Sequence, residues 1–393
     1  MGRLFCRIAP LALLAALVFP AHLVAAEGAD PIKVGGLFAS SGKSAFVGTA
    51  SKLVAEMTVK QINGAGGILG RPLEMIIFDT ESDPNVALQK ARQLVEKEGV
   101  LALIGPTTTG GGMAIKQYTE AQQIPAIMTV GGDAIIAGGK YGPFHWTFKV
   151  PQRTETAVKK IYGLLQEKGL KTVAILTAQD GFGQDGMMHL EAQAANYGLT
   201  VVAKETLDPK DSDYSAQAFK LTVGKPDAVV VWVIGPSGAI AQKNFKALPN
   251  YTGLVVQCHG QPDPKFIELA GEAAEGALMP GTKLMAPEAL SEDDPQRPVI
   301  KQFLADYTAA GYDKEFPINT HSGYALDALL LLKAGLEKAG VVDRAALRDA
   351  LEQLQGVVGV SGVFSMTPED HNGLDEASLL MLTVRDGAFH IAK

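Results

Sequence analysis

The feature that most limits the possible folds is a regular alternation of short apolar runs with segments of helical spacing. Between the runs, apolar residues such as Leu53, Val54 and Met57 recur one helical turn apart. This β-α-β-α-β order predicts a parallel, doubly wound sheet and therefore an α/β fold. The apolar runs, each of a length suited to one strand, lie at residues 32–37, 73–78, 100–104 and 125–128.

The same alternation starts again after Pro151. Two such series predict two lobes, each built on an all-parallel sheet that helices cover on both faces, which makes its strands apolar almost throughout. The second series contains a helical segment at 155–168 and strands at 173–177, 201–204, 228–234 and 254–256. A loop rich in Pro, Asp and Glu is expected at 280–297, and helices at 299–310, 321–339 and 344–354.

The first 26 residues have the pattern of a secretory signal peptide. Arg3 and Arg7 precede an apolar run at residues 11–19, and small residues then stand where a signal peptidase cleaves. The run is shorter than the roughly 20 apolar residues of a transmembrane helix, although an uncleaved anchor is the alternative. We expect cleavage after Ala26 and a soluble, acidic mature protein in the periplasm.

Charge and cysteine content exclude several classes of protein. The formal net charge of -7 argues against a nucleic-acid-binding protein, which usually has a strongly basic surface. Cys6 and Cys258 are the only cysteines, so a disulfide scaffold and a cysteine-built metal site are excluded. No two histidines of the mature chain lie four residues apart, and no metal site is predicted.

Three glycine-containing segments approach known motifs and fail on spacing. Residues 36–44, GLFASSGKS, place five residues between the glycines where a nucleotide-binding P-loop has four. Residues 64–66 lack the third glycine of a dinucleotide fingerprint, because Leu69 stands at that position. Residues 235–238 lack the closing glycine of a nucleophile elbow and are expected to form a loop. The sequence therefore predicts no cofactor and no catalytic centre.

A set of N-terminal motifs is more specific when its members are taken together. The first strand begins with IKVG, the first helical segment contains QIN followed by GGI, the second strand ends in DTESDP, and the third leads into IGPTTTG. This set resembles the start of the Leu/Ile/Val-binding family of periplasmic solute-binding proteins, which are the capture subunits of ABC importers. The resemblance extends over essentially the whole mature chain.

The resemblance implies a specific domain organisation: two doubly wound α/β lobes joined by three chain crossings, which is the type I periplasmic binding protein fold, with a ligand in the cleft between them. The crossings are expected near Val150, Gly281 and Gly356. The first lobe would then contain residues 27–150 and 281–356, and the second lobe residues 151–280 and 357–393.

Thr108, Thr109 and Gly110 are the strongest candidates for ligand contacts. In open α/β sheets, ligands bind beyond the carboxyl ends of the strands, where the next helix presents unpaired N–H groups and the positive end of its dipole. That environment suits a carboxylate. By resemblance, Thr109 matches a residue whose hydroxyl binds the ligand carboxylate. The alternative, that these threonines cap a helix, is compatible with ligand binding.

The resemblance adds further candidates in the cleft. Gly131, through its backbone, and Asp133, through its side chain, match positions that contact the ligand near its ammonium group, although Asp133 could equally cap a helix. Phe182 matches an aromatic residue that closes over the ligand. Phe46 and Val47 match the loop that covers the ligand from the first lobe. Ordinary packing is the alternative for these three apolar residues.

His259 departs from the pattern of the amino-acid-binding relatives. Its position matches a glutamate that pairs with the ammonium group of the ligand, and an imidazole lacks that fixed negative charge. Either Asp133 alone balances an ammonium group or the ligand has none. The predicted ligand is therefore a branched-chain or other apolar amino acid, or an aromatic or aliphatic carboxylic acid.

The predicted function is capture of this small solute and its delivery to an ABC permease, by a monomer whose lobes close without chemistry. A sensing module that presents its ligand to a membrane receptor is the alternative, because the same two-lobed unit serves in receptors. A secreted hydrolase or dehydrogenase would need a complete catalytic or cofactor motif.

Overall fold

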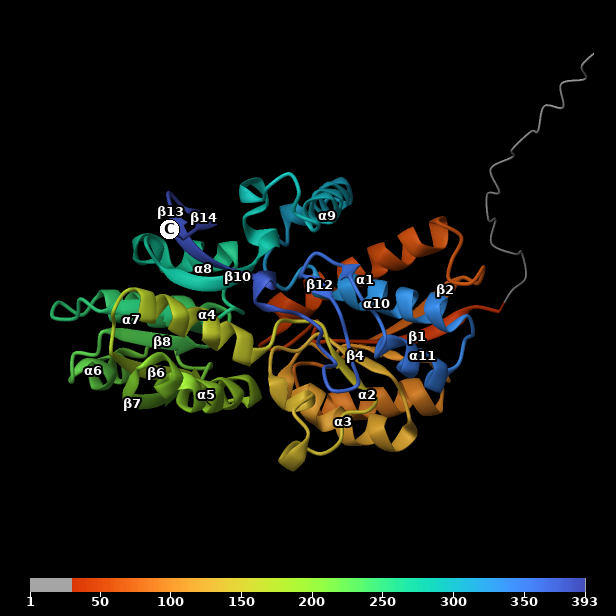
Figure 1. Cartoon of the computed structure of the whole chain (residues 1–393), viewed down its shortest axis with the longest axis horizontal. Helices are drawn as coiled ribbons and strands as arrows, with labels where there is room; N and C mark the ends of the chain where they lie inside the picture. Colours follow the sequence, from red (N-terminus) through yellow and green to blue (C-terminus); the bar gives the residue numbers. More distant parts are fainter. Residues whose placement is uncertain (1–29, 393) are drawn as a thin grey trace, which may run out of the picture.

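A computed structural model describes residues 30–392 of the chain, and the expected signal peptide lies outside this range. Two sheets divide the described residues into two lobes that lie side by side (Figure 1). The first lobe is drawn in red, orange and blue, and the second lobe mainly in green. The α/β fold predicted from the sequence is confirmed. None of the described helices combines the length and the hydropathy that a membrane crossing requires.

The sheet of the first lobe is parallel throughout and has the strand order β2-β1-β3-β4-β5. Its strands are β1 (Ile32–Phe38), β2 (Leu73–Asp79), β3 (Leu103–Ile104), β4 (Ala126–Met128) and β5 (Thr147–Lys149). The helices of this lobe are α1 (Ala45–Gly64), α2 (Pro84–Glu96), α3 (Thr109–Gln122), α9 (Arg297–Ala309), α10 (Tyr324–Ala339) and α11 (Arg344–Leu351).

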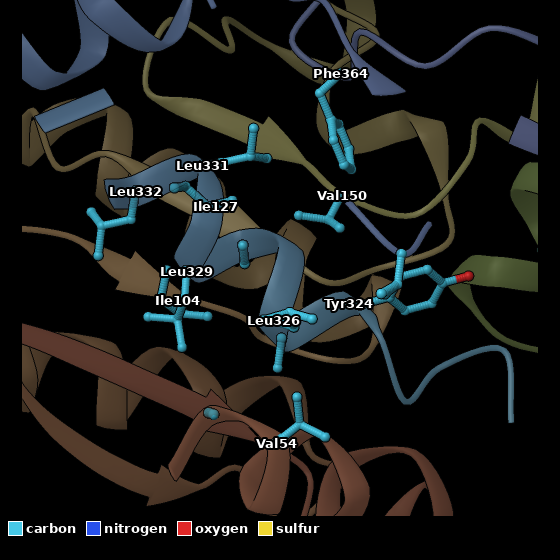
Figure 2. Packing of buried hydrophobic residues seen from close by; sticks show 14 of the residues in the cluster. Val54, Ile104, Ile127, Val150, Tyr324, Leu326, Leu329, Leu331, Leu332 and Phe364 are labelled. Carbon is cyan, nitrogen blue, oxygen red and sulfur yellow. The ribbon is translucent and has the colours of Figure 1, made fainter. Parts of the chain in front are cut away.

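Two hydrophobic clusters cover the two faces of this sheet, as β1 illustrates. Ile32, Val34 and Phe38 belong to a cluster with residues of α1, α10 and α11, and Leu37 belongs to a second cluster with residues of α2 and α3. The side chains of a strand alternate between its faces, so one apolar strand contributes to both clusters. The first cluster surrounds α10, where Leu326, Leu329 and other apolar side chains meet the strands (Figure 2).

The sheet of the second lobe has the order β14-β13-β10-β9-β8-β6-β7. Its strands are β6 (Thr172–Ala178), β7 (Thr200–Leu207), β8 (Ala228–Trp232), β9 (Leu254–Gln257), β10 (Leu278–Thr282), β13 (Leu379–Arg385) and β14 (Ala388–Ile391). Its helices are α4 (Thr154–Glu167), α5 (Gly181–Gln193), α6 (Ser215–Thr222), α7 (Pro236–Lys246) and α8 (Pro264–Ala270). The expected loop at 235–238 is the start of α7, after Gly235 at φ 72°.

The expectation that the second sheet is all-parallel is wrong. β13 runs antiparallel to β10, and β14 runs antiparallel to β13. The reason is the route of the chain: β13 arrives from the first lobe rather than from a crossover helix of its own sheet, and a tight turn at Asp386-Gly387 then folds β14 back beside it. The expected loop at 280–297 is also partly wrong, because Pro280 lies within β10.

Three segments carry the chain between the lobes. The first crossing lies between Val150, which packs in the core of the first lobe, and α4, which begins the second lobe. The second crossing lies between Thr282, where β10 of the second lobe ends, and Leu284, which packs in the core of the first lobe. The third segment differs from the expectation at Gly356. Residues 357–374, which include the short pair β11 (Val357–Val358) and β12 (Val363–Phe364), place apolar side chains in the core of the first lobe, and the chain then crosses between Leu374 and Leu379.

Candidate ligand-binding cleft

A cavity of about 250 Å³ lies between the two lobes. Pockets for drug-sized ligands span about 300–1,000 Å³, so this volume suits a molecule of small-metabolite size. The first lobe and the chain crossing contribute Lys43, Ser44, Val47, Ser82, Pro84, Thr107, Thr108, Thr109, Gly110, Thr129, Gly131, Pro151, His321 and Tyr324. The second lobe contributes Asp180, Gly181, Phe182, Ile234, His259 and Gly260.

The cavity lies where strands of both sheets end. Thr107 and Thr129 follow β3 and β4, and Asp180 and His259 follow β6 and β9. Ligands of open α/β sheets bind beyond the carboxyl ends of the strands for topological reasons, and here two such edges face each other. The position of the cavity therefore follows from the two parallel strand series that the sequence contains.

The N-terminus of α3 forms one wall of the cavity. The Thr108 hydroxyl caps the helix by accepting a hydrogen bond from the Gly111 N–H at 3.2 Å. The Thr109 hydroxyl accepts from the Gly132 N–H at 3.1 Å. The N–H groups of Thr109 and Gly110, in the first turn, have no helical acceptor, and the positive end of the helix dipole is added to them. This wall is suited to an anionic group, and the Lys43 side chain adds a positive charge at its rim.

Phe182 and Gly131 make a tight contact between the lobes at the cavity. A Cβ atom built on Gly131 would lie 2.7 Å from Cε2 of Phe182, so the ring of the second lobe packs directly on the backbone of the first. Gly181 also lies against α3, because a Cβ atom on it would be 3.4 Å from the Gly110 nitrogen. Asp180 caps α5 by accepting from the Gly183 N–H at 2.9 Å.

His259 is 2% exposed and lies in a wall of aromatic rings. Its ring centroid is 5.7 Å from that of Phe182 and 5.4 Å from that of Trp232. Burial lowers the pKa of His259 to about 3, and the positive charge of Lys149 contributes to the same effect. The imidazole is therefore neutral at physiological pH.

The remaining predicted residues lie in different surroundings. Val47 lines the cavity, whereas Phe46 does not: its ring stands edge-on to His321 at 6.2 Å and covers Gly235. Tyr324 lines the cavity and also packs in the core of the first lobe. His321 was missed by sequence reasoning. Its Nε2 lies 2.9 Å from the Gly260 carbonyl oxygen, and burial lowers its pKa to about 4.

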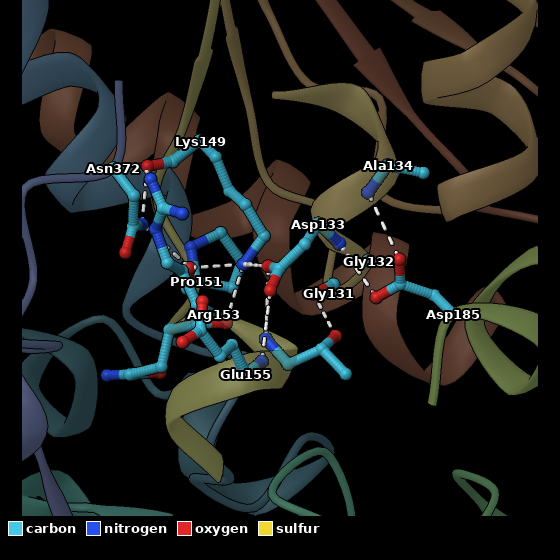
Figure 3. Close-up of polar contacts among 12 residues, drawn as sticks. Gly131, Gly132, Asp133, Ala134, Lys149, Pro151, Arg153, Glu155, Asp185 and Asn372 are labelled. Carbon is cyan, nitrogen blue, oxygen red and sulfur yellow. Dashed lines mark hydrogen bonds and ion pairs between the residues drawn. The ribbon is translucent and has the colours of Figure 1, made fainter. Parts of the chain in front are cut away.

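Asp133 is absent from the cavity wall, contrary to the expectation that its carboxylate meets the ligand. The carboxylate accepts hydrogen bonds from the N–H groups of Thr154 and Glu155 at 3.0 Å each, so it caps α4 of the second lobe (Figure 3). It also lies 3.5 Å from Nζ of Lys149. The helix-capping alternative therefore applies to Asp133, but the helix that it caps is α4 of the other lobe and not the turn that follows Asp133 in the sequence.

Asp185 makes the reciprocal contact from the second lobe. Its carboxylate accepts from the N–H groups of Asp133 at 2.8 Å and Ala134 at 3.1 Å, at the start of a 3₁₀ turn of the first lobe (Figure 3). Asp185 is 3% exposed, and burial followed by the nearby Asp133 carboxylate raises its pKa. Asp133, Asp185 and His189 bring potential metal-ligand atoms within 4.8 Å of one another, but N–H donors already occupy both carboxylates.

Lys149 completes the polar network at the first chain crossing. The side chain is fully buried, and its Nζ donates to the carbonyl oxygens of Pro151 at 2.6 Å and Gln152 at 2.5 Å. Burial lowers the pKa of Lys149 to about 8, against the opposing effect of Asp133. Asn372, next to the third crossing, donates to the carbonyl oxygens of Lys149 and Pro151 at 2.9 Å (Figure 3). The first and third crossings are therefore held together.

Two α/β lobes, three crossings and a small cavity between facing strand ends define a two-lobed solute-binding protein. Comparison of the sequence with protein families agrees with this class: the periplasmic binding protein model matches residues 31–388. The chain belongs to the periplasmic binding protein family, and it is similar to several proteins named as Leu/Ile/Val-binding. Members of this family are extracytoplasmic solute-binding proteins rather than enzymes.

Individual relatives are distant but match over nearly their whole length. Leu/Ile/Val-binding protein homolog 3 of Brucella melitensis is 24% identical over 86% of this chain and 87% of its own. A leucine-, isoleucine-, valine-, threonine- and alanine-binding protein of Pseudomonas aeruginosa is 23% identical over 93% and 91%. The crystal structure of an extracellular ligand-binding receptor from Rhodopseudomonas palustris HaA2 has a TM-score of 0.82 and 27% identity, covering 93% of this chain and 100% of that one.

Proposed function

We propose that the protein is exported by its signal peptide to the periplasm, where as a monomer it captures a small carboxylate-bearing solute between its lobes and delivers it to an ABC permease. The observation that carries this proposal is the free first turn of α3 at the cavity wall. Thr108, Thr109 and Gly110 would bind the carboxylate, since two unpaired N–H groups and the helix dipole point to one small volume.

The other walls fit the remainder of such a solute. Phe182 and Val47 supply apolar surface from opposite lobes, and Gly131 offers backbone without a side chain in the way. The names of the relatives support an apolar solute, because several are described as binding leucine, isoleucine and valine. Phe46 and Val47 both lie in the first turn of α1 rather than in the loop expected from the sequence, and Phe46 would act indirectly, by packing this turn against His321 and Gly235. Asp133 is not part of the proposed ligand contacts, because its carboxylate already caps α4.

The proposal is tested by thermal unfolding of the mature protein, residues 27–393, with a panel of carboxylic and amino acids. A ligand present at about 100 times its dissociation constant stabilises the folded protein by about 2.7 kcal/mol, which raises the melting temperature by a few degrees. We expect at least one carboxylate to do so, and the uncharged amide of the same acid to have no effect.

A matched pair of variants locates the carboxylate. Thr108→Ala removes the cap of α3 at the cavity, and Asp343→Ala removes the equivalent cap of α11, where the Asp343 carboxylate accepts from the Ala346 N–H at 3.0 Å far from the cavity. Both losses should destabilise the protein by about 1 kcal/mol. Only Thr108→Ala should reduce the ligand-induced shift. Equal shifts in the two variants would mean that the carboxylate is bound elsewhere.

A further inference from the structure

His259 presents hydrogen-bonding capacity that the protein itself does not use. Its Nδ1 is enclosed and has no hydrogen-bond partner among residues 30–392. Because Nδ1 is enclosed, a solute in the cavity would meet the other ring nitrogen, Nε2, for which residues 30–392 supply no hydrogen-bond partner either. Folded proteins pair nearly all of their buried polar groups, so an unpaired ring nitrogen in a cavity wall indicates that a bound molecule supplies its partner. The rings of Phe182 and Trp232 pack beside the buried imidazole.

The cavity wall is poor in negative charge. Asp180 is the one carboxylate residue in the wall, and it already caps α5 through the Gly183 N–H. Asp133 and Asp185 lie outside the wall and are occupied by the backbone of the opposite lobe. An ammonium group next to His259 would therefore lie among aromatic rings and a neutral imidazole, which is unfavourable, and the one anionic group in the wall, Asp180, is already engaged by the Gly183 N–H.

A neutral imidazole offers one donor and one acceptor. These suit a hydroxyl group, which can donate and accept, or a carbonyl oxygen, which accepts. We propose, building on the function proposed above, that the solute carries a carboxylate but no ammonium group, and that His259 selects it by hydrogen bonding to an uncharged hydroxyl or carbonyl oxygen. The solute is thus a small hydroxy or oxo carboxylic acid with an apolar remainder that contacts Phe182 and Val47.

The test uses pairs of probes that differ only in the group expected to meet His259. Isothermal titration calorimetry at neutral pH compares leucic acid with leucine, phenyllactate with phenylalanine, and hydroxybenzoate with benzoate, all on the mature wild-type protein. We expect the hydroxyl-bearing member of the preferred pair to bind at least about tenfold more tightly, since a site built to hydrogen bond rejects partners that leave its polar groups unpaired.

Two variants assign the preference to His259. His259→Gln keeps a neutral donor and acceptor and should retain the preference for the hydroxy acid. His259→Glu supplies a carboxylate and should reverse the preference toward the amino acid by about tenfold or more. Because the wild-type comparison stands without either variant, a folding failure of one of them leaves the proposal open to refutation.

The possible results separate the two proposals. If leucine or phenylalanine binds the wild type as tightly as its hydroxy analogue, the selection by His259 is refuted, while carboxylate capture stands. If Asp180→Asn then abolishes amino-acid binding, Asp180 is the counter-charge and the refutation is complete. If none of the carboxylates binds although the protein is folded, the proposed function fails, and the inference about His259 fails with it.

Discussion

Asp185 allows the contribution of lobe closure to ligand affinity to be measured without altering the ligand site. The side chain belongs to α5 of the second lobe, yet both of its oxygens accept hydrogen bonds from first-lobe N–H groups, at 2.8 and 3.1 Å. Opening of the hinge would break both bonds and return the groups to water. Asp185→Ala should therefore destabilise the closed state and leave the open state unchanged.

The magnitude follows from the geometry. Each hydrogen bond to a charged group contributes about 1.5–3 kcal/mol. Burial of the carboxylate and its repulsion by Asp133 oppose this gain, as the raised pKa of Asp185 indicates. We expect a net loss of about 2–3 kcal/mol in the closed state, which corresponds to a dissociation constant about 30- to 150-fold higher.

The assay is calorimetric titration of the ligand found in the screen, combined with urea unfolding of the ligand-free protein. Asp227→Ala is the matched control, because the Asp227 carboxylate accepts from the N–H groups of Lys171 and Thr172 at 2.8 Å, entirely within the second lobe. Asp227→Ala should lower the free energy of unfolding and keep the ligand affinity. Asp185→Ala should keep the free energy of unfolding of the ligand-free protein and lower the ligand affinity. A dissociation constant within about threefold of the wild type would refute the reasoning.

Three further results are expected. Gly131→Ala places a methyl group 2.7 Å from Phe182 and should weaken ligand binding by about tenfold or more, with partial recovery on adding Phe182→Leu in calorimetric titration. The pKa values of His259 and His321, about 3 and 4, lie below those of the unfolded chain, so the unfolded state takes up protons first. As the pH is lowered from about 6.5 to 4, the free energy of unfolding measured in urea should therefore decrease. Each of the two histidines contributes up to about 1.4 kcal/mol per pH unit, so the decrease should be less steep in His321→Gln. Cys258 is buried, which raises its pKa to about 12, and a thiol reagent should label it only in urea.

Much of the fold could be predicted because each parallel strand and each helix has its own local hydrophobic pattern in the sequence. The exception is β13, whose apolar run at Leu379–Arg385 looks like any other strand. Its direction depends on where the chain last crosses between the lobes. That crossing is set by the packing of Val360, Phe364 and Leu374 in the first core, which no local pattern encodes.

The candidate site was predictable to a similar degree. The wall at Thr108–Gly110 follows from one strand-to-helix turn, so motif and geometry coincide. Asp133 was ambiguous, and one signal could have resolved it: α4 begins after Arg153, which cannot cap a helix, so its first N–H groups needed an acceptor from elsewhere. His321 carries no such signal, because it reaches the cavity only through tertiary packing.

The antiparallel strand β13 also bears on when the protein can fold. It lies inside the second sheet, between β10 and β14, although it is among the last segments to be synthesised. In the first lobe, α10 and α11 cover one face of the sheet, and they are synthesised long after its strands. The cluster around α10 therefore cannot form until most of the polypeptide has left the ribosome, whereas the second-lobe cluster between Ala174 and Val255 is available earlier. The second lobe therefore has most of its apolar contacts available before the first lobe can close around α10, so the two lobes complete their cores at different stages of synthesis.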